Sequence, residues 1–169
     1  DYAHSKGIVH RDVKPSNIML RPVNSQESGP DWQPVLMDFG IAKIIGADTG
    51  LTGTGVVGTL DYLAPEQINA SHAVDHRADI FALGVSAYYL CTFEFPWIGN
   101  ESTGKAALQH DTQPAENILT HAPKLNRKLA EAIMRCIAIN PDDRFQSAEQ
   151  LVRFLKPLAS GSQLGSFCL

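Results

Sequence analysis

The chain has 169 residues, of which 44% are hydrophobic, and carries a formal net charge of −4. This length is sufficient for one domain with its own core. The acidic balance, without any run of basic residues, argues against a surface for nucleic acid. The longest apolar stretch, 80–91, is interrupted by polar residues and too short to cross a bilayer, so no membrane contact is expected within this segment.

The N-terminal third predicts a helix end followed by two short strands. The sequence DYAHSKG at 1–7 is typical of the last turn of a helix that Gly7 closes. Apolar residues at 18–20 and 35–37 predict two strands. Between them, 21–34 is rich in Pro, Ser, Gly and Asp, which predicts an exposed loop. Trp32 leaves open a second interpretation, in which this loop binds a partner.

Three helices are predicted in the remainder. Residues 78–93 are apolar almost all round, which indicates a helix buried inside the domain. Apolar residues recur at helical spacing from 129 to 137, and Asn140-Pro141 stops that helix. Ser147 and Gln150 form a capping-box pattern for the last helix. Its expected buried face consists of Leu151, Phe154, Leu155 and Leu158.

The three cysteines, Cys91, Cys136 and Cys168, are odd in number and lack CxxC spacing. The first two fall in apolar helical patterns, so we expect buried, reduced thiols and a cytoplasmic location. The tail 159–169 contains SGSQLGS, which predicts a flexible tail or the start of a linker.

Chemical information is concentrated in three strings in a fixed order: HRDVKPSN at 10–17, DFG at 38–40 and APE at 64–66. They include a carboxylate at Asp12, an ammonium at Lys14, an amide at Asn17 and a second carboxylate at Asp38. Phosphoryl transfer from ATP needs an acid to orient a hydroxyl, a cation near the phosphate and oxygen ligands for Mg²⁺. The order and joint spacing of the three strings argue against chance matches in an unrelated domain.

These strings resemble those of protein kinases, and GTLDYLAPEQ at 58–67 is similar to the Hanks-type serine/threonine kinases of bacteria. The resemblance covers residues 1–158 and implies an α+β protein-kinase-like fold. The expected part is the mainly α-helical large, C-terminal lobe, with short strands at the catalytic and DFG loops. The family's glycine-rich loop, strand lysine and helix glutamate lie upstream of HRD. We therefore expect a fragment whose small N-terminal lobe is missing, and which is inactive alone.

The resemblance assigns catalytic roles to four residues. Asp12 is expected to orient the substrate hydroxyl and accept its proton, and Lys14 to neutralise charge on the moving phosphoryl group. Asn17 and Asp38 are the expected Mg²⁺ ligands, with Lys14, Asn17 and Asp38 together binding ATP. For each residue alone, a surface polar group in a loop is the alternative.

The substrate class follows from the same resemblance. Lysine at position 14, with Gly58 and Thr59 before the APE string, is similar to the serine/threonine class and differs from tyrosine kinases. Gly58 and Thr59 are expected to help present the hydroxyl of a protein substrate. Thr59 is also expected to contact Asp12 and Lys14. A linker after the domain often leads to a membrane span in related kinases, so an anchor outside this segment stays open.

Residues 41–57 correspond to the activation segment of the family. Thr49, Thr52 and Thr54 are candidate phosphoacceptors, and Arg11 is the expected cationic partner of the added phosphate. The alternative is that these are ordinary residues of a Gly/Thr-rich loop.

Four residues have expected structural roles: His10, Glu66, Asp79 and Arg144. His10 opens the HRD string, and the carboxylate of Asp79 is expected to bond the backbone of that loop. The alternative for Asp79 is a carboxylate that only favours its helix dipole. Glu66 and Arg144 are expected to form a buried ion pair; the alternative is two unrelated exposed charges.

His72 and His76 have metal-like spacing, but no third ligand is evident. Asp75 between them is more simply a cap for the helix that follows. Two functional alternatives to an active kinase remain at this point. One is a pseudokinase that acts as a binding scaffold, and the other is a truncated lobe that only docks partners.

Overall fold

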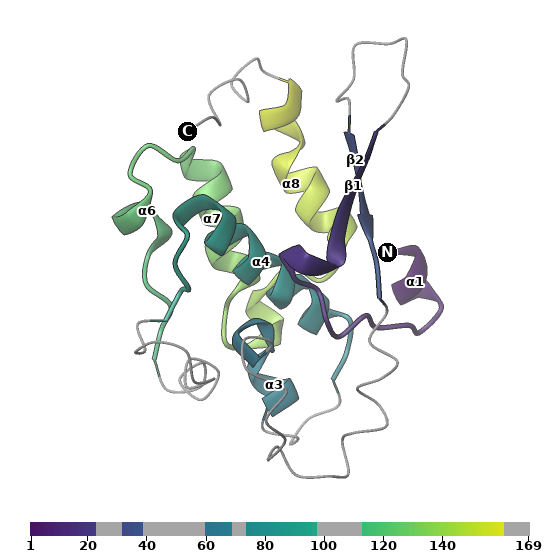
Figure 1. Cartoon of the computed structure of the whole chain (residues 1–169). Coiled ribbons are helices and arrows are strands. Elements are labelled where there is room, and N and C mark those ends of the chain that lie inside the picture. Colours follow the sequence, from purple (N-terminus) through teal and green to yellow (C-terminus); the bar gives the residue numbers. More distant parts are fainter. Residues whose placement is uncertain (23–31, 39–59, 69–73, 98–112, 161–169) are drawn as a thin grey trace.

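The computed structural model describes residues 1–22, 32–38, 60–68, 74–97 and 113–160 (Figure 1). Helices predominate in these ranges, and the described strands form one two-stranded sheet. In chain order the elements are α1 (Tyr2–Ser5), η1 (Pro15–Asn17), β1 (Ile18–Pro22), β2 (Trp32–Leu36), η2 (Leu60–Tyr62), α3 (Pro65–Ile68), α4 (Arg77–Thr92), α6 (Ile118–His121), α7 (Arg127–Cys136), η3 (Pro141–Asp143) and α8 (Ala148–Ser160). The mostly helical content and the short strands agree with the fold class that the sequence predicts.

The strands pair as an antiparallel hairpin in which Ile18 faces Leu36 and Pro22 faces Trp32. The prediction of a loop over all of 21–34 was therefore wrong at both ends, because cross-strand pairing extends into the polar segment. The Arg21 guanidinium donates a hydrogen bond to the Gln33 side chain across this extension. Residues 23–31 lie outside the described part, and the side chain of Trp32 is exposed.

Helix α4 runs through the middle of the molecule, with α3, α7, α8 and the hairpin arranged around it (Figure 1). Residues on all its sides are buried, among them Phe81, Val85 and Tyr88, as the prediction of a buried helix requires. At Gly84 the helix is crossed closely by the end of α7. A Cβ there would lie 2.5 Å from Cys136 Cβ, so only glycine fits this crossing.

Two apolar clusters lie against α4. The larger joins α4 to α6 and α7, and within it the rings of Phe81 and Trp97 stack with centroids 5.7 Å apart. The smaller lies between α4, α7 and α8 and consists of Ile80, Ala132, Cys136, Phe145 and Leu151, with Phe154 and Leu155 packed beside it. The predicted inner face of the last helix is thus confirmed for Leu151, Phe154 and Leu155.

The helix ends refine the predicted boundaries. Helix α1 is followed by Gly7 with a φ of 73°, a left-handed conformation that glycine adopts easily. Ser147 Oγ accepts a hydrogen bond from Gln150 N at 3.0 Å, but the Gln150 side chain accepts from Gln146 N, so only half of the capping box forms. The carboxylate of Asp1 also accepts a bond from Ala148 N at 3.0 Å, which satisfies another amide at the start of α8.

The N-cap position of α4 lies one residue after the predicted Asp75. His76 occupies the N-cap position, and the Asp75 carboxylate accepts from Arg77 N at 2.8 Å. His76 Nε2 instead contacts the Gln146 carbonyl at 2.9 Å, and His72 lies outside the described residues. In the described ranges no group of three His, Cys, Asp or Glu residues could hold a metal ion.

Cys136 is buried and Cys91 half-buried, and both are free thiols, as expected. Burial raises the pKa of Cys136 to about 12 and also raises that of Cys91. No helix within the described residues combines the length and the apolar character that a membrane span requires.

Candidate active site

The HRD string lies in a loop between α1 and β1, and His10 ties this loop to the end of the hairpin. His10 Nδ1 lies 3.3 Å from Asp12 N, and Nε2 lies 2.9 Å from the Met37 carbonyl. Because Nδ1 faces an N–H donor, Nε2 must carry the proton and donate to Met37. Met37 N in turn donates to the Asn17 carbonyl at 2.8 Å. Both polar backbone groups of Met37 therefore bond the loop, which fixes the backbone at the residue before Asp38.

Asp12, Lys14 and Asn17 meet at one point of this loop. Lys14 Nζ lies 3.1 Å from Asp12 Oδ2, and both side chains are largely shielded from solvent. Asn17 Nδ2 donates to the Asp12 carbonyl at 2.8 Å and to Asp12 Oδ2 at 3.0 Å. Two bonds from one amide fix the direction of the Asn17 side chain and hold the Asp12 carboxylate in a single orientation.

A buried carboxylate from α4 holds the other side of the loop. Asp79 accepts hydrogen bonds from His10 N and Arg11 N, each at 2.8 Å, as the resemblance implies. Its Oδ2 also lies 2.8 Å from His4 Nε2. Asp79 stands in the first turn of α4, so the alternative role beside the helix dipole holds as well.

Arg11 and Asp38 have positive φ values of 64° and 55°. Such left-handed backbone is strained for residues other than glycine and typically costs about 1–3 kcal/mol. At Arg11 the conformation turns two successive N–H groups toward the Asp79 carboxylate, which explains how the strain is maintained. Both strained residues belong to the strings that carry the predicted chemistry.

The donor set fits Mg²⁺ in its chemistry. Asn17 Nδ2 donates both of its hydrogen bonds to Asp12, and within the described residues the side-chain oxygen Asn17 Oδ1 accepts no hydrogen bond. Asp38 is exposed and follows Met37, whose backbone is bonded to the same loop. One amide oxygen and one carboxylate are hard ligands of the kind that Mg²⁺ prefers.

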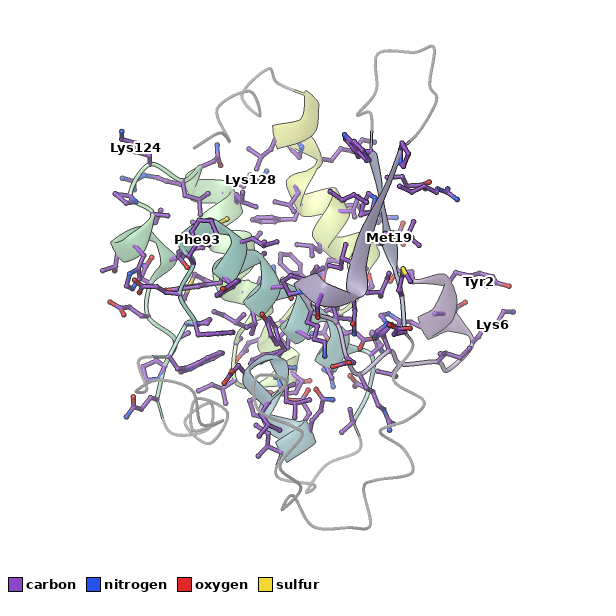
Figure 2. All side chains as sticks on the ribbon, in the orientation of Figure 1. Tyr2, Lys6, Met19, Phe93, Lys124 and Lys128 are labelled. Carbon is purple, nitrogen blue, oxygen red and sulfur yellow. The ribbon has the colours of Figure 1, made fainter. Side chains whose placement is uncertain are left out.

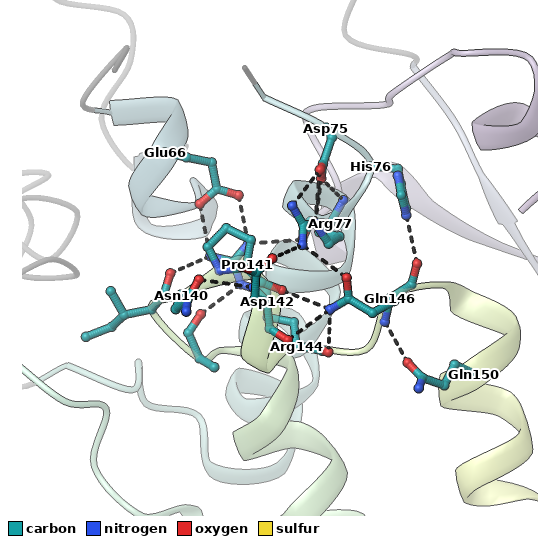
Figure 3. Close-up of polar contacts among 12 residues, drawn as sticks. Glu66, Asp75, His76, Arg77, Asn140, Pro141, Asp142, Arg144, Gln146 and Gln150 are labelled. Carbon is teal, nitrogen blue, oxygen red and sulfur yellow. Dashed lines mark hydrogen bonds and ion pairs between the residues drawn. The ribbon is translucent and has the colours of Figure 1, made fainter. Parts of the chain in front are cut away.

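Below this loop, Glu66 and Arg144 form the predicted ion pair. Arg144 Nη1 and Nη2 donate to the two Glu66 carboxylate oxygens at 2.7 and 2.9 Å, and Figure 3 shows the two groups facing each other. Arg144 is 0% exposed. The two-bonded geometry and the burial exclude the alternative of unrelated exposed charges.

All five N–H donors of the Arg144 guanidinium have an acceptor. Besides Glu66, they bond three backbone carbonyls, those of Arg77, Ala138 and Ile139, at 3.2, 2.7 and 2.9 Å. The guanidinium also lies over the Phe81 ring, 4.7 Å from its centroid. One arginine thus joins α3, the start of α4 and the segment after α7.

The remaining predicted residues Thr49, Thr52, Thr54, Gly58 and Thr59 lie outside the described residues. The structure adds two contributors that sequence reasoning missed, His4 and Met37. Met37 acts through its backbone, so no residue-type signal could have revealed it. His4 contacts Asp79 across 75 positions, a relation that no local pattern encodes.

A hollow of about 300 Å³ opens behind the loop, between α1, the hairpin and α4. Its lining is mostly apolar and includes Val13, Leu36 and Leu83, with His4, His10 and Asp79 as polar members. Within the described residues, the side of the HRD loop that faces this hollow is therefore only partly packed against protein.

Comparison with known proteins identifies the family of the chain. The family model described as "Protein kinase domain" matches residues 1–154. PknJ of Mycobacterium tuberculosis, a serine/threonine-protein kinase, is 40% identical over 150 residues, which are 88% of this chain and 24% of that protein. PknB of Mycolicibacterium smegmatis is 36% identical over 154 residues, covering 89% and 23%, and Pkn1 of Myxococcus xanthus is 40% identical over 146 residues, covering 86% and 20%.

The chain therefore belongs to the protein kinase family. Within it, the chain is of the bacterial Hanks type, as its similarity to these serine/threonine kinases indicates. It spans about a quarter of the length of the curated relatives that it matches.

Proposed function

We propose that the protein to which this chain belongs transfers the γ-phosphoryl group of ATP to serine or threonine hydroxyls of protein substrates. The observation that carries the proposal is the arrangement of Asp12, Lys14 and Asn17. The Lys14 ammonium lies 3.1 Å from the Asp12 carboxylate, and the Asn17 amide fixes the orientation of that carboxylate through a hydrogen bond. This is the set of groups that positions a hydroxyl and neutralises charge during phosphoryl transfer.

In this proposal each side chain has one task. Asp12 Oδ orients the substrate hydroxyl and accepts its proton, while Lys14 Nζ balances charge on the transferred group. Asn17 and Asp38 hold Mg²⁺, which supplies neutralisation of the ATP phosphates when bound. The protein contributes mainly positioning, because the transition state of phosphoryl transfer is loose.

We assign two further functions to residues outside the described ranges. Gly58 and Thr59 help to present the hydroxyl of the substrate. Phosphate on Thr49, Thr52 or Thr54 pairs with Arg11 and orders the activation segment. Mass spectrometry of the active enzyme tests this assignment, because an enzyme without phosphate on residues 49–54 contradicts it. Replacement of both Thr52 and Thr54 by Ala is expected to lower activity.

We assign residues 1–158 to the large lobe of the kinase domain and 159–169 to a tail. The hairpin supports this assignment because it exposes large apolar side chains, among them Met19, Leu20, Leu36 and Met37. Such a surface is suited to packing against another part of the same domain, here the small lobe. The lobe described here is inactive alone in this view, and the whole protein is cytoplasmic or anchored from outside this segment.

The alternative from another class is a pseudokinase or a lobe that only docks partners. Asp12, Lys14, Asn17 and Asp38 are all present, which favours the active enzyme. Upstream sequence separates the two, since an active kinase requires the glycine-rich loop, the strand lysine and the helix glutamate there.

The direct test is Asp12→Asn in the full-length protein, assayed for phosphoryl transfer and for ATP binding. Loss of the acid is expected to lower turnover by about 10²–10⁴-fold and leave ATP affinity largely unchanged. Asp143→Asn is the matched control, because Asp143 is exposed and lies far along the chain in η3. Near-normal turnover of the Asp12 variant would refute the assigned role.

A further inference from the structure

The C-terminal end of α4 carries an aromatic residue where glycine is favoured. The helix ends at Thr92, and Phe93 follows with a φ of 58° and ψ of 18°, while its N–H donates to the Tyr89 carbonyl at 2.7 Å. A left-handed residue at this place is most easily a glycine, because a Cβ is crowded there by about 1–2 kcal/mol. The Phe93 side chain is also 78% exposed, so it recovers little by burial. Burial therefore gives little reason for an aromatic residue at this position.

Phe93 is the outer end of a continuous set of rings, which we name the aromatic row: Phe93, Tyr89, Phe95 and Tyr62. Successive ring centroids are 6.4, 5.0 and 5.5 Å apart, within the range of favourable aromatic contacts. Figure 2 shows Phe93 on the side of the molecule opposite Tyr2 and Met19. The row thus leads from the exposed end of α4 to η2, which directly follows residues 58–59.

An acidic group lies at the inner end of the aromatic row. Asp61 precedes Tyr62 in η2 and is half-buried, and within the described residues it has no hydrogen-bond or ion-pair partner. Burial raises the pKa of its carboxyl group, so a cation placed there would relieve the cost of burying the charge. The whole chain carries a formal net charge of −4, which favours the approach of a basic segment.

Resting on the proposed function, we propose that the aromatic row docks the protein substrate. The substrate places a large apolar residue on Phe93 and a basic residue, best an arginine, at Asp61. Arginine suits this end because its guanidinium pairs with a carboxylate and also stacks on aromatic rings such as Tyr62. In this proposal the left-handed conformation of Phe93 costs folding stability, and its exposed ring contributes to substrate binding.

The three ring-to-ring steps limit the spacing of the two substrate residues. An extended chain advances about 3.3 Å per residue, so at most about five residues separate the apolar and the basic side chain. Because η2 follows residues 58–59, the basic residue is the one nearer the phosphoacceptor.

The test measures peptide binding by fluorescence anisotropy, using full-length protein that carries Asp12→Asn to prevent turnover. The probes are labelled synthetic peptides with one Thr, an adjacent Arg, and a Phe four to six residues beyond that Arg on either side.

In this Asp12→Asn background, Phe93→Ala and Phe93→Gly are each expected to lower the affinity for the best-binding peptide about tenfold. The peptide in which Ser replaces that Phe is expected to bind all three proteins alike. Asp61→Asn is expected to remove the preference for Arg and to keep that for Phe.

Val152→Ala is the matched control, because Val152 is 63% exposed on α8 and far from the row in sequence. Thermal unfolding supplies a second readout: Phe93→Gly is expected to melt at or above the parent temperature, since it relieves the left-handed strain. A merely structural Phe93 would instead lower the melting temperature in both variants and leave peptide affinity unchanged.

The proposal is overturned if no peptide of the set binds, or if both Phe93 variants bind the best peptide as the parent does. An equal loss in Val152→Ala overturns it as well. These outcomes are separable from failure of the proposed function. Docking without phosphoryl transfer by the Asp12-containing enzyme refutes only the activity, and transfer without an effect of Phe93 refutes only the docking surface.

Discussion

Glu66 and Arg144 are 78 positions apart in the sequence, yet their side chains meet in a buried pair with two hydrogen bonds of 2.7 and 2.9 Å. The pair joins α3, which carries the APE string, to the segment between α7 and α8. A guanidinium with five satisfied donors has little freedom to move, so the start of α3 is held in place relative to α4 (Figure 3).

We expect Glu66→Ala to lower the free energy of unfolding by about 3–5 kcal/mol, because it leaves the Arg144 charge buried without its counter-ion. Urea unfolding of the two proteins measures this difference. Glu149→Ala is the control: its partner Arg153 lies in the same helix with both side chains exposed, and its loss is expected to cost about 1 kcal/mol or less. Similar costs for the two variants would contradict the claim that burial makes the Glu66 pair important.

Asp79→Asn is expected to disturb the HRD loop, because the Asp79 carboxylate bonds the backbone of that loop. An amide has one oxygen to accept from His10 N and Arg11 N, whereas the carboxylate uses one oxygen for each. The unpaired N–H is expected to cost about 1–3 kcal/mol of stability. In the full-length protein, the proposed phosphoryl transfer is expected to slow while ATP affinity changes little. Asp143→Asn is again the exposed control, and full turnover of the Asp79 variant would show that this carboxylate does not position the loop.

Gly84→Ala tests the close crossing of α4 and α7. The added methyl would lie 2.5 Å from Cys136 Cβ and 2.8 Å from Ile137 Cγ2, so the helices must separate. Overpacking of this kind typically costs about 1–3 kcal/mol, measured here as a shift in the urea midpoint. Gly7→Ala is a useful contrast, since nothing lies within 4 Å of its Cβ and only its φ of 73° opposes the change. If Gly84→Ala proves neutral, the crossing is looser than the structure indicates.

The Asp75–Arg77 contact predicts a pH dependence of stability. Burial raises the pKa of Asp75, but hydrogen bonds and the charge of Arg77 outweigh it, so the net pKa lies below the ordinary 3.8. A lowered folded-state pKa gives stability that is present above 3.8 and is lost as the pH falls through the lowered value. In urea unfolding from about pH 5 to about pH 2, Asp75→Asn is expected to reduce this loss. An unchanged pH profile in the variant would show that the contact contributes nothing.

Local patterns predicted the helices well because their signals lie within one segment. The apolar run of α4 and the helical spacing of α7 placed both helices within two residues of their observed starts. The predicted cap at Asp75 was close as well, since its carboxylate does bond the first N–H of α4.

Non-local contacts were not available from local patterns. The length of the hairpin depends on pairing between residues that flank a polar segment, so 21–22 and 32–34 were mistaken for loop. The bond between His4 and Asp79 joins α1 to α4, and no sequence spacing rule predicts a contact between these two helices. The Glu66–Arg144 pair was predicted only because the motifs resemble those of a family in which acid and arginine pair at these places.

The bonds that Met37 makes to His10 and Asn17 of the HRD loop have a practical consequence for protein engineering. They fix the hairpin at its base, whereas the connection between Pro22 and Trp32 joins the strands at the opposite end. Each doubling of a loop's length costs only about 0.6 kcal/mol of closure entropy. We therefore expect this connection to accept an inserted reporter domain or affinity tag without displacement of Asp12 and Asn17.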